Sequence, residues 1–178
     1  MRPASFSLFL FFLLFIHGTK AKNLIHETCR TCAQSDPNIN YTFCASSLQA
    51  APASRRASVR GLGSISITLI EHNVTDTRHF IKHLMGMKLD SYVKECLSDC
   101  FDLYTDAIDS VQKAREQYNS KQYDEANVVI STVLDATSTC EGGFTEKKGL
   151  VSPLTERNND TFQLSAIALS IMHMVQTG

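Results

Sequence analysis

The sequence predicts an all-α protein: an antiparallel up-down-up-down four-helix bundle with an N-terminal helical hairpin, stapled by disulfides. Four long segments carry apolar residues at helical spacing, and the links between them are short and polar or contain Gly and Pro. Two shorter helical segments flank a Ser-Asp-Pro-Asn break near the N-terminus. We therefore expect a leader at residues 1–21 and one domain at 22–178, with the hairpin at 22–52 and the bundle at 53–178.

The clearest periodicity predicts a bundle helix of roughly 28 residues. Its apolar positions alternate steps of four and three and define one buried face: Val93, Leu97, Cys100, Tyr104, Ala107, Val111, Ala114 and Tyr118. Asp90-Ser91 caps the start of this helix, and Asn119-Ser120 ends it. A further helix repeats the pattern over residues 123–140, and we expect Gly142-Gly143 to stop it.

The first and last bundle helices are expected at residues 58–87 and after Ser152-Pro153. Their inward positions are Leu62, Ile65, Leu69, Phe80 and Leu84 in the first helix, and Phe162, Ala166 and Leu169 in the last, with Leu164, Ile167, Ile171 and Val175 beside them. Gly61 and Gly63 weaken the first helix by about 1 kcal/mol each relative to Ala. We interpret these two glycines as the point where a neighbouring helix approaches closely.

The N-terminus indicates export. Arg2 precedes an apolar run from Phe6 to Ile16, and Thr19-Lys-Ala21 offers the small residues that a signal peptidase reads. The run is too short to cross a hydrocarbon core of about 30 Å as a helix. Three N-glycosylation sequons, which begin at Asn40, Asn73 and Asn159, fit a secreted protein.

The six cysteines predict disulfides, because an exported chain folds under oxidising conditions. The CxxC at Cys29 is also a spacing of redox and zinc sites, but no βαβ pattern accompanies it. A Cys29–Cys44 bridge would close the mouth of the hairpin and give about 3 kcal/mol in the chain-entropy model. Cys100 and Cys140 lie on the core faces of consecutive antiparallel helices, where a bridge needs no special geometry.

The sequence contains no recognisable catalytic set, and we expect no enzyme activity, cofactor, metal or small-molecule substrate. A GxSxG elbow is absent, and His79 and His83 share a helix face, with His72 a turn or more earlier, but lack the glutamate of HExxH. A net charge of −1 gives no electrostatic reason for a nucleic-acid or membrane partner. By elimination, the function is expected to reside in a surface.

Several segments, in their order along the chain, resemble the plant invertase and pectin methylesterase inhibitors. They are LIHETC, YTFCASSL, RGLGSISITL, CFDLYTDAIDSV, QYDEANVVISTVL and TCEGGF. The resemblance covers nearly all of the chain after the leader. It implies the fold predicted above, the pairings Cys29–Cys44 and Cys100–Cys140, and a non-enzymatic inhibitor that occludes an enzyme's active-site cleft in the plant cell wall (the apoplast).

The resemblance leaves two targets open. Invertase inhibitors carry Pro-Lys-Phe before the third bundle helix, whereas this chain has Lys121, Gln122 and Tyr123, out of register for Pro and Lys. The DAIDS run with Asp106 and Asp109, together with Thr139, is similar to pectin methylesterase inhibitors. We therefore favour pectin methylesterase over acid invertase as the partner. Two other interpretations are a pollen or seed allergen without an enzyme target and a redox or metal protein built on CxxC.

Cys32 and Cys96 depart from the family pattern. They are expected either to form a third bridge, which would tie the hairpin to the bundle, or to remain as two free buried thiols. A bridge requires Cα atoms within about 7 Å of each other.

Overall fold

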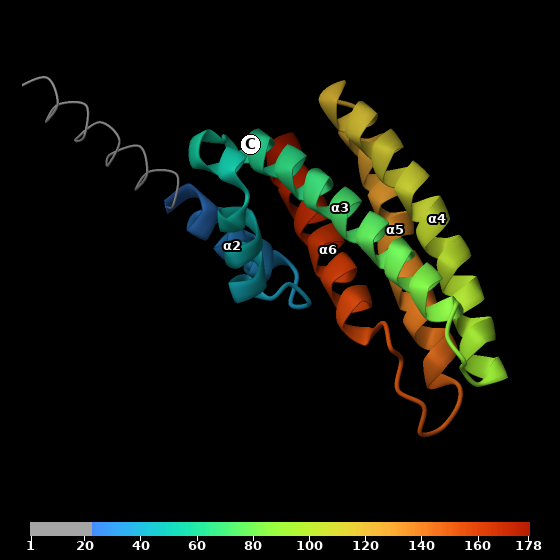
Figure 1. Cartoon of the computed structure of the whole chain (residues 1–178). Coiled ribbons are helices and arrows are strands. Elements are labelled where there is room, and N and C mark those ends of the chain that lie inside the picture. Colours follow the sequence, from blue (N-terminus) through green and yellow to red (C-terminus); the bar gives the residue numbers. More distant parts are fainter. Residues whose placement is uncertain (1–22) are drawn as a thin grey trace, which may run out of the picture.

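The computed structural model describes residues 23–178, so the predicted signal peptide at 1–21 lies outside the described residues. A helix at residues 23–35 is followed by α2 (Tyr41–Ala50), the 3-10 helix η1 (Pro52–Arg56), α3 (Val59–Met85), α4 (Ser91–Asn119), α5 (Tyr123–Thr145) and α6 (Thr155–Thr177). The four long helices run up, down, up and down, and each packs against the next, with α6 closing on α3 (Figure 1). The predicted all-α bundle is confirmed.

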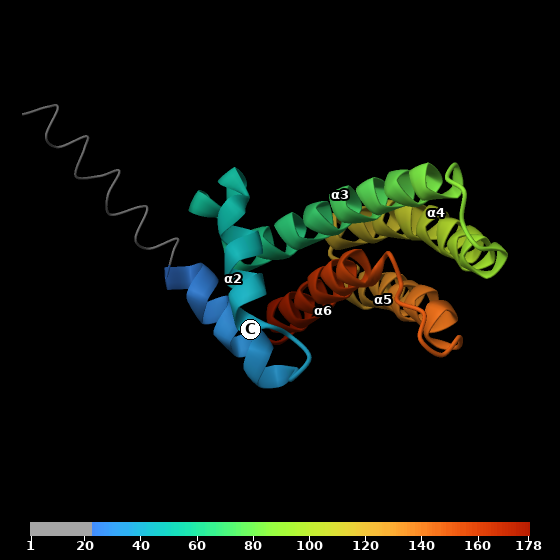
Figure 2. The same cartoon turned by 60° about the horizontal axis from the view of Figure 1, so that its bottom comes forward.

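The helical hairpin lies against the α3–α6 side of the bundle, since α2 contacts both of these helices. Figure 2 shows it beside the end of the bundle where α3 begins and α6 finishes. Gln163 of α6 holds the hairpin turn: its side chain accepts a hydrogen bond from the Asn40 amide (2.8 Å) and donates one to the Asn38 carbonyl (2.6 Å). The α4–α5 side, on the opposite edge of the bundle, is left uncovered by the hairpin.

Polar side chains mark the starts of three helices, and the one at Asp90 is the cap that the sequence predicts. Asn40, Ser58 and Asp90 accept hydrogen bonds from backbone amides in the first turns of α2, α3 and α4. The expected stop at Gly142-Gly143 is wrong, because α5 continues to Thr145. In this part of α5 the hydroxyl of Tyr92, on α4, donates to the Gly143 carbonyl (2.8 Å), so packing against α4 supports the helix through the glycines.

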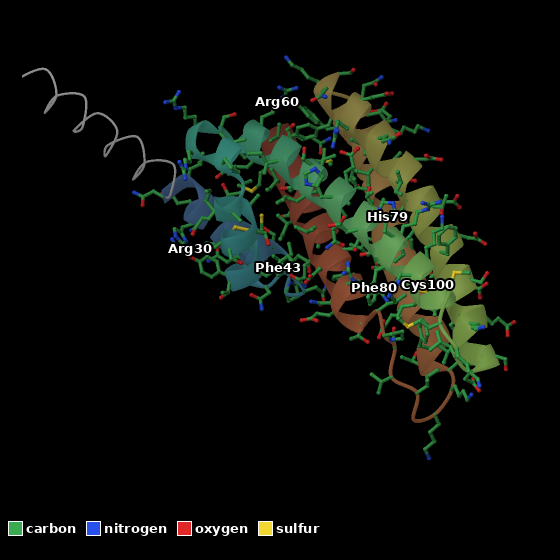
Figure 3. All side chains as sticks on the ribbon, viewed as in Figure 1. Arg30, Phe43, Arg60, His79, Phe80 and Cys100 are labelled. Atoms are coloured by element: carbon green, nitrogen blue, oxygen red, sulfur yellow. A yellow bond between two sulfur atoms is a disulfide. The ribbon has the colours of Figure 1, made fainter. Side chains whose placement is uncertain are left out.

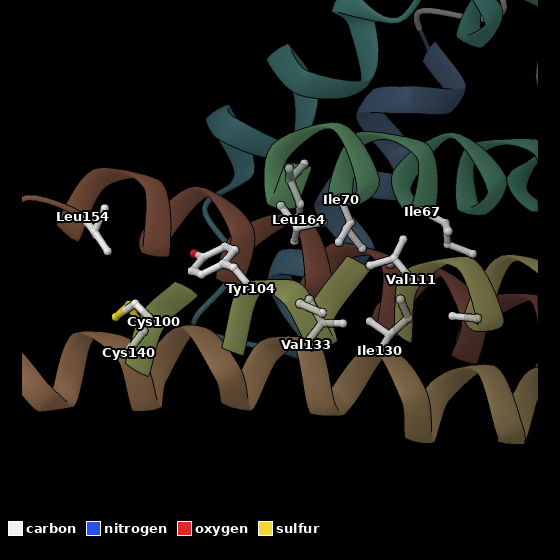
Figure 4. Packing of buried hydrophobic residues seen from close by; sticks show 14 of the residues in the cluster. Ile67, Ile70, Cys100, Tyr104, Val111, Ile130, Val133, Cys140, Leu154 and Leu164 are labelled. Atoms are coloured by element: carbon white, nitrogen blue, oxygen red, sulfur yellow. A yellow bond between two sulfur atoms is a disulfide. The ribbon is translucent and has the colours of Figure 1, made fainter. Parts of the chain in front are cut away.

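The core consists of two clusters, and Figure 4 shows the packing of the larger one. The larger one lies inside the bundle, and all predicted α4 positions except the half-buried Val93 are buried in it. The smaller one joins the hairpin to α3 and α6. The predicted inward face of α3 is only partly correct. Leu62 is buried, but the other four predicted positions are only half-buried against the two clusters. The α3 positions that fill the bundle core are Ile67, Ile70, Val74 and Ile81.

Of the two glycines in α3, Gly63 does mark a close approach of helices, whereas a Cβ atom at Gly61 would meet only Ala57 and Ser58 just before it in the chain. A Cβ atom added at Gly63 would lie 2.2 Å from Oη of Tyr118, on α4. The Tyr118 side chain is 1% exposed, and its hydroxyl donates to the Arg60 carbonyl at 2.8 Å. Gly63 therefore leaves the space in which this ring lies against α3.

The structure contains the two disulfides that the family resemblance implies. Cys29 is bonded to Cys44 within the hairpin, and Cys100 is bonded to Cys140 between α4 and α5. Cys32 and Cys96 are free and buried in different core clusters, so the alternative of a third bridge is not realised.

A buried polar network crosses the bundle and includes a side chain from every long helix. The Tyr104 hydroxyl donates to Asn158 (2.8 Å), whose amide donates to Glu141 (2.7 Å). Thr161 lies 3.3 Å from the Tyr104 hydroxyl and donates to Asn73 of α3. These bonds fix the axial register of the helices, because sliding one helix by a turn would leave several buried polar groups unpaired.

Candidate functional site

A shallow groove of about 270 Å³ runs between α4 and α5 on the uncovered side of the bundle. Its lining is made of short side chains: Leu103, Asp106, Ala107 and Ser110 from α4, and Thr132, Asp135, Ala136 and Thr139 from α5. Two residues predicted from the sequence, Asp106 and Thr139, thus come from different helices to the same groove. Both are exposed.

A second groove, of about 410 Å³, continues this surface around the Cys100–Cys140 disulfide. The two grooves share Leu103 and Thr139, and we call their combined lining the α4–α5 face. Its charged residues are all acidic, and all are exposed: Asp99, Asp106, Asp135 and Glu146. No lysine or arginine lines either groove, so the α4–α5 face has a negative potential.

Asp135 is a member of this face that the sequence interpretation did not select. It lies one helical turn before Thr139, and this spacing is the signal that could have found it. Asp109, which the interpretation did select, is exposed on α4 one turn after Asp106 but lines neither groove.

The other predicted set, Lys121, Gln122 and Tyr123, lies in the α4–α5 turn. At the helix rise of 1.5 Å per residue this turn is roughly 20 Å from Asp106, so the two sets do not form one site. Lys121 has a positive φ of 63°, which lets the chain reverse between the helices. Lys121 and Gln122 are exposed, whereas Tyr123 is half-buried.

The Tyr123 side chain is held in place by its neighbours. Its hydroxyl accepts a hydrogen bond from Arg60 Nε (3.0 Å), and its ring packs edge-to-face on Tyr118 with centroids 5.2 Å apart. Arg60, labelled at the start of α3 in Figure 3, also donates to the Asn119 carbonyl (3.1 Å) at the end of α4. Burial raises the pKa of Tyr118 to about 12. The contacts among Tyr118, Tyr123 and Arg60 hold the α4–α5 turn against the start of α3.

The structure gives no support for metal chemistry in the part of the chain it describes. His72, His79 and His83 are exposed on α3, and no three His, Cys, Asp or Glu side chains of residues 23–178 are grouped as metal ligands. Nor does any described helix combine the length and hydropathy that a bilayer-crossing segment needs.

Residues 23–171 match the family model described as plant invertase/pectin methylesterase inhibitor. The chain belongs to this family. It is 44% identical to a Platanus acerifolia protein named "Putative invertase inhibitor", across 96% of this chain and 97% of the relative. It is 28% identical to the "Pectinesterase inhibitor" of Actinidia deliciosa, across 89% and 83% of the two chains. The family and these relatives are inhibitors and not enzymes.

A solved structure supports the fold. The crystal structure of a mutant form of a pectin methylesterase inhibitor from Arabidopsis superposes with a TM-score of 0.69 at 23% identity, covering 80% of this chain and 96% of that one. The members of this inhibitor family block pectin methylesterase or invertase by forming protein–protein complexes. The function of this chain is therefore to bind and inhibit an enzyme of one of these two classes.

Proposed function

We propose that this inhibitor is secreted into the plant cell wall and blocks pectin methylesterase by laying the α4–α5 face across the active-site cleft. The observation that carries the proposal is the purely acidic charge of that face, contributed by Asp99, Asp106, Asp135 and Glu146. Pectin is a polymer of galacturonate and its methyl ester, and an enzyme that binds it must accommodate carboxylates. A negative protein surface complements such a cleft, whereas the substrate of invertase, sucrose, carries no charge.

The shape of the face also suits the proposal. A stable inhibitor complex buries roughly 800 Å² on each partner, which requires a broad surface and not a single inserted residue. The α4–α5 face is lined by side chains no larger than Leu103 and Glu146 and is left uncovered by the hairpin. Two helices joined by the Cys100–Cys140 disulfide present it.

Acid invertase is the second candidate target, and the names of relatives favour it. Besides the Platanus protein, a 30% identical Arabidopsis relative is named "Cell wall / vacuolar inhibitor of fructosidase 2", with 77% of this chain covered. In this interpretation the contact residues would be Lys121, Gln122 and Tyr123. The hydrogen bond from Arg60 and the packing on Tyr118 oppose insertion of the Tyr123 ring into a sugar-binding site.

The deciding experiment measures inhibition of purified plant pectin methylesterase and of acid invertase by the secreted protein at the acidic pH of the cell wall. We expect loss of pectin methylesterase activity and none of invertase activity. Inhibition of invertase alone would overturn the choice of target. If both enzymes kept full activity at micromolar inhibitor, the proposal that this chain inhibits either of them would be overturned. That result would favour the interpretation as an allergen without an enzyme target.

The D135N substitution tests the face itself, because residues 135–137 then form the sequon Asn-Ala-Thr. A glycan attached there would stand in the α4–α5 groove, and we expect inhibition to fall by 100-fold or more. D135Q removes the same charge without a glycan and is expected to weaken inhibition by about fivefold or less, the scale of one surface charge pair. Equal inhibition by D135Q and by D135N shown by mass spectrometry to be glycosylated would place the contact surface elsewhere.

Secretion is tested separately by expressing the full chain in plant cells with a C-terminal fluorescent tag. We expect fluorescence in the cell wall and the medium. Deletion of residues 1–21 is expected to retain the protein inside the cell, and retention of the full chain would contradict the proposal.

A further inference from the structure

The three sequons differ in the exposure of their asparagine and in the residue that lies three positions after it. Asn40 and Asn159 are both exposed and both are followed, three residues later, by a phenylalanine: Asn40-Tyr-Thr-Phe43 and Asn159-Asp-Thr-Phe162. The corresponding residue after Asn73 is the exposed Asp76. Asn73 itself is half-buried, and its carboxamide accepts the hydrogen bond from Thr161 that links α3 to α6.

Each Asn-Phe pair lines one hollow of the surface. Asn40, Phe43 and Asn159 border a hollow of about 360 Å³ between the hairpin turn and α6. Asn159 and Phe162 border another of about 460 Å³ between α5 and α6. Phe43, labelled in Figure 3, lies on the side of α2 that faces the bundle. The two hollows meet at Asn159, so both sequons open onto one continuous surface.

The other side chains in the larger hollow suit a sugar. Ser138 and Thr145 supply exposed hydroxyl groups, and the half-buried Glu141 supplies a carboxylate. A pyranose ring presents one face of C–H bonds and a rim of hydroxyl groups, so it binds where an aromatic ring lies among polar side chains. Phe162 is half-buried and leaves part of its ring available.

We propose that Asn40 and Asn159 carry N-linked glycans, that the first sugar on each packs on Phe43 or Phe162 in these hollows, and that Asn73 is unmodified. The capping role of Asn40 is compatible with this, because the cap uses Oδ1 and the sugar is attached at Nδ2. The Asn40 glycan then lies over the hairpin and α6, the Asn159 glycan lies over α5 and α6, and the groove of Asp106 and Asp135 stays bare. This inference rests on the secretion proposed above and does not depend on which enzyme is the target.

The first test is glycopeptide mass spectrometry of the full chain secreted from plant cells. We expect sugars at Asn40 and Asn159 and none at Asn73, and N73Q should leave the intact mass of the glycan complement unchanged. Occupancy at Asn73, or an empty Asn159, would overturn the proposal. Retention of the chain inside the cell would also overturn the proposal. That outcome is measured by the location of the protein, so it is distinguished from a failure to inhibit either enzyme.

The second test asks whether Phe162 contacts the sugar, with the four proteins wild type, N159Q, F162A and N159Q/F162A. An aromatic contact is expected to make the melting temperature of the glycosylated wild type about 2–4 °C higher than that of N159Q. F162A and N159Q/F162A should have the same melting temperature, because the sugar at Asn159 no longer has an aromatic ring to pack on. F162A lowers stability by itself, but both members of the second pair share that change.

Trimming the glycans to a single N-acetylglucosamine should preserve the difference between wild type and N159Q, since only the first sugar reaches Phe162. A difference that survives in F162A, or that disappears on trimming, would contradict packing of the first sugar on the ring.

Discussion

The G63A substitution probes the close approach of α3 and α4. The added methyl group would lie 2.2 Å from Oη and 2.8 Å from Cζ of Tyr118, and 3.2 Å from Cγ2 of Ile171. Real Cβ atoms do not approach other atoms at the first two distances. The Tyr118 ring must therefore move, although it is buried, packs on Tyr123 and donates a hydrogen bond to the Arg60 carbonyl.

Three contributions set the size of the effect. Overpacking a core position costs about 1–3 kcal/mol. Loss of the Tyr118–Arg60 hydrogen bond adds about 1 kcal/mol, and replacing a helical glycine by alanine gives back about 1 kcal/mol. We expect G63A to lower the free energy of unfolding by about 2 kcal/mol, which corresponds to a fall of about 4–8 °C in melting temperature for a domain of this size.

The control is G142A, a glycine-to-alanine change within α5, where nothing lies within 4 Å of the added Cβ atom. Since only the helix propensity changes there, G142A is expected to raise the stability by about 1 kcal/mol. Urea unfolding followed by circular dichroism measures both variants. If G63A proved as stable as wild type or G142A, the close contact between Gly63 and Tyr118 would be refuted.

Three further predictions concern the hairpin turn, two buried tyrosines and one aspartate. Q163A removes both hydrogen bonds to the hairpin turn, and amide exchange at residues 36–44 should speed up markedly; unchanged exchange would show that Gln163 does not hold the turn. Burial raises the pKa values of Tyr104 and Tyr118 to about 12, so the folded protein keeps protons that the unfolded chain loses from about pH 10. The free energy of unfolding should be constant with respect to these groups below pH 10 and fall between about pH 10 and 12, with a shallower fall in Y104F. A hydrogen bond from Lys147 lowers the pKa of Asp90 in the folded protein. The ionised Asp90 therefore stabilises the fold at pH values above the ordinary carboxyl pKa, and this stabilisation is lost as the pH falls through the pKa of Asp90 in the folded protein. NMR titration of K147A should show the Asp90 pKa closer to its ordinary value.

The α4 helix could be predicted almost residue by residue, and α3 could not. The spacing on α4 is unbroken, because this helix packs directly against α3 and α5 and presents one apolar face to the bundle core. The α3 helix also packs against the hairpin, and its apolar residues divide between two neighbours. Ile65 lies half-buried against the hairpin cluster, whereas Ile67 and Ile70 fill the bundle core. Leu69 lies half-buried against both clusters. Periodicity shows that both sets are apolar but not which neighbour each one meets.

The candidate site was predictable only in part. Asp106 and Thr139 come together because consecutive antiparallel helices must face each other, and this follows from the topology. The prediction missed Asp135, because its one-turn spacing from Thr139 places it on the same side of α5 but does not show that α4 forms a groove beside it. The fixed position of Tyr123 could not be read either, since its hydrogen-bond partner Arg60 lies 63 residues earlier in the chain.

The pairing of α4 and α5 has a consequence for how fast a target can be released. These helices are joined at one end by the turn at Lys121 and at the other by the disulfide between Cys100 and Cys140, 40 residues apart in sequence. Together they form a closed covalent ring, so Asp106 and Asp135 keep their spacing before any enzyme arrives. The entropy of ordering this surface is lost during folding and not on association. The surface that binds the target enzyme is thus already ordered in the free inhibitor. Reduction of the Cys100–Cys140 disulfide should shorten the lifetime of the complex.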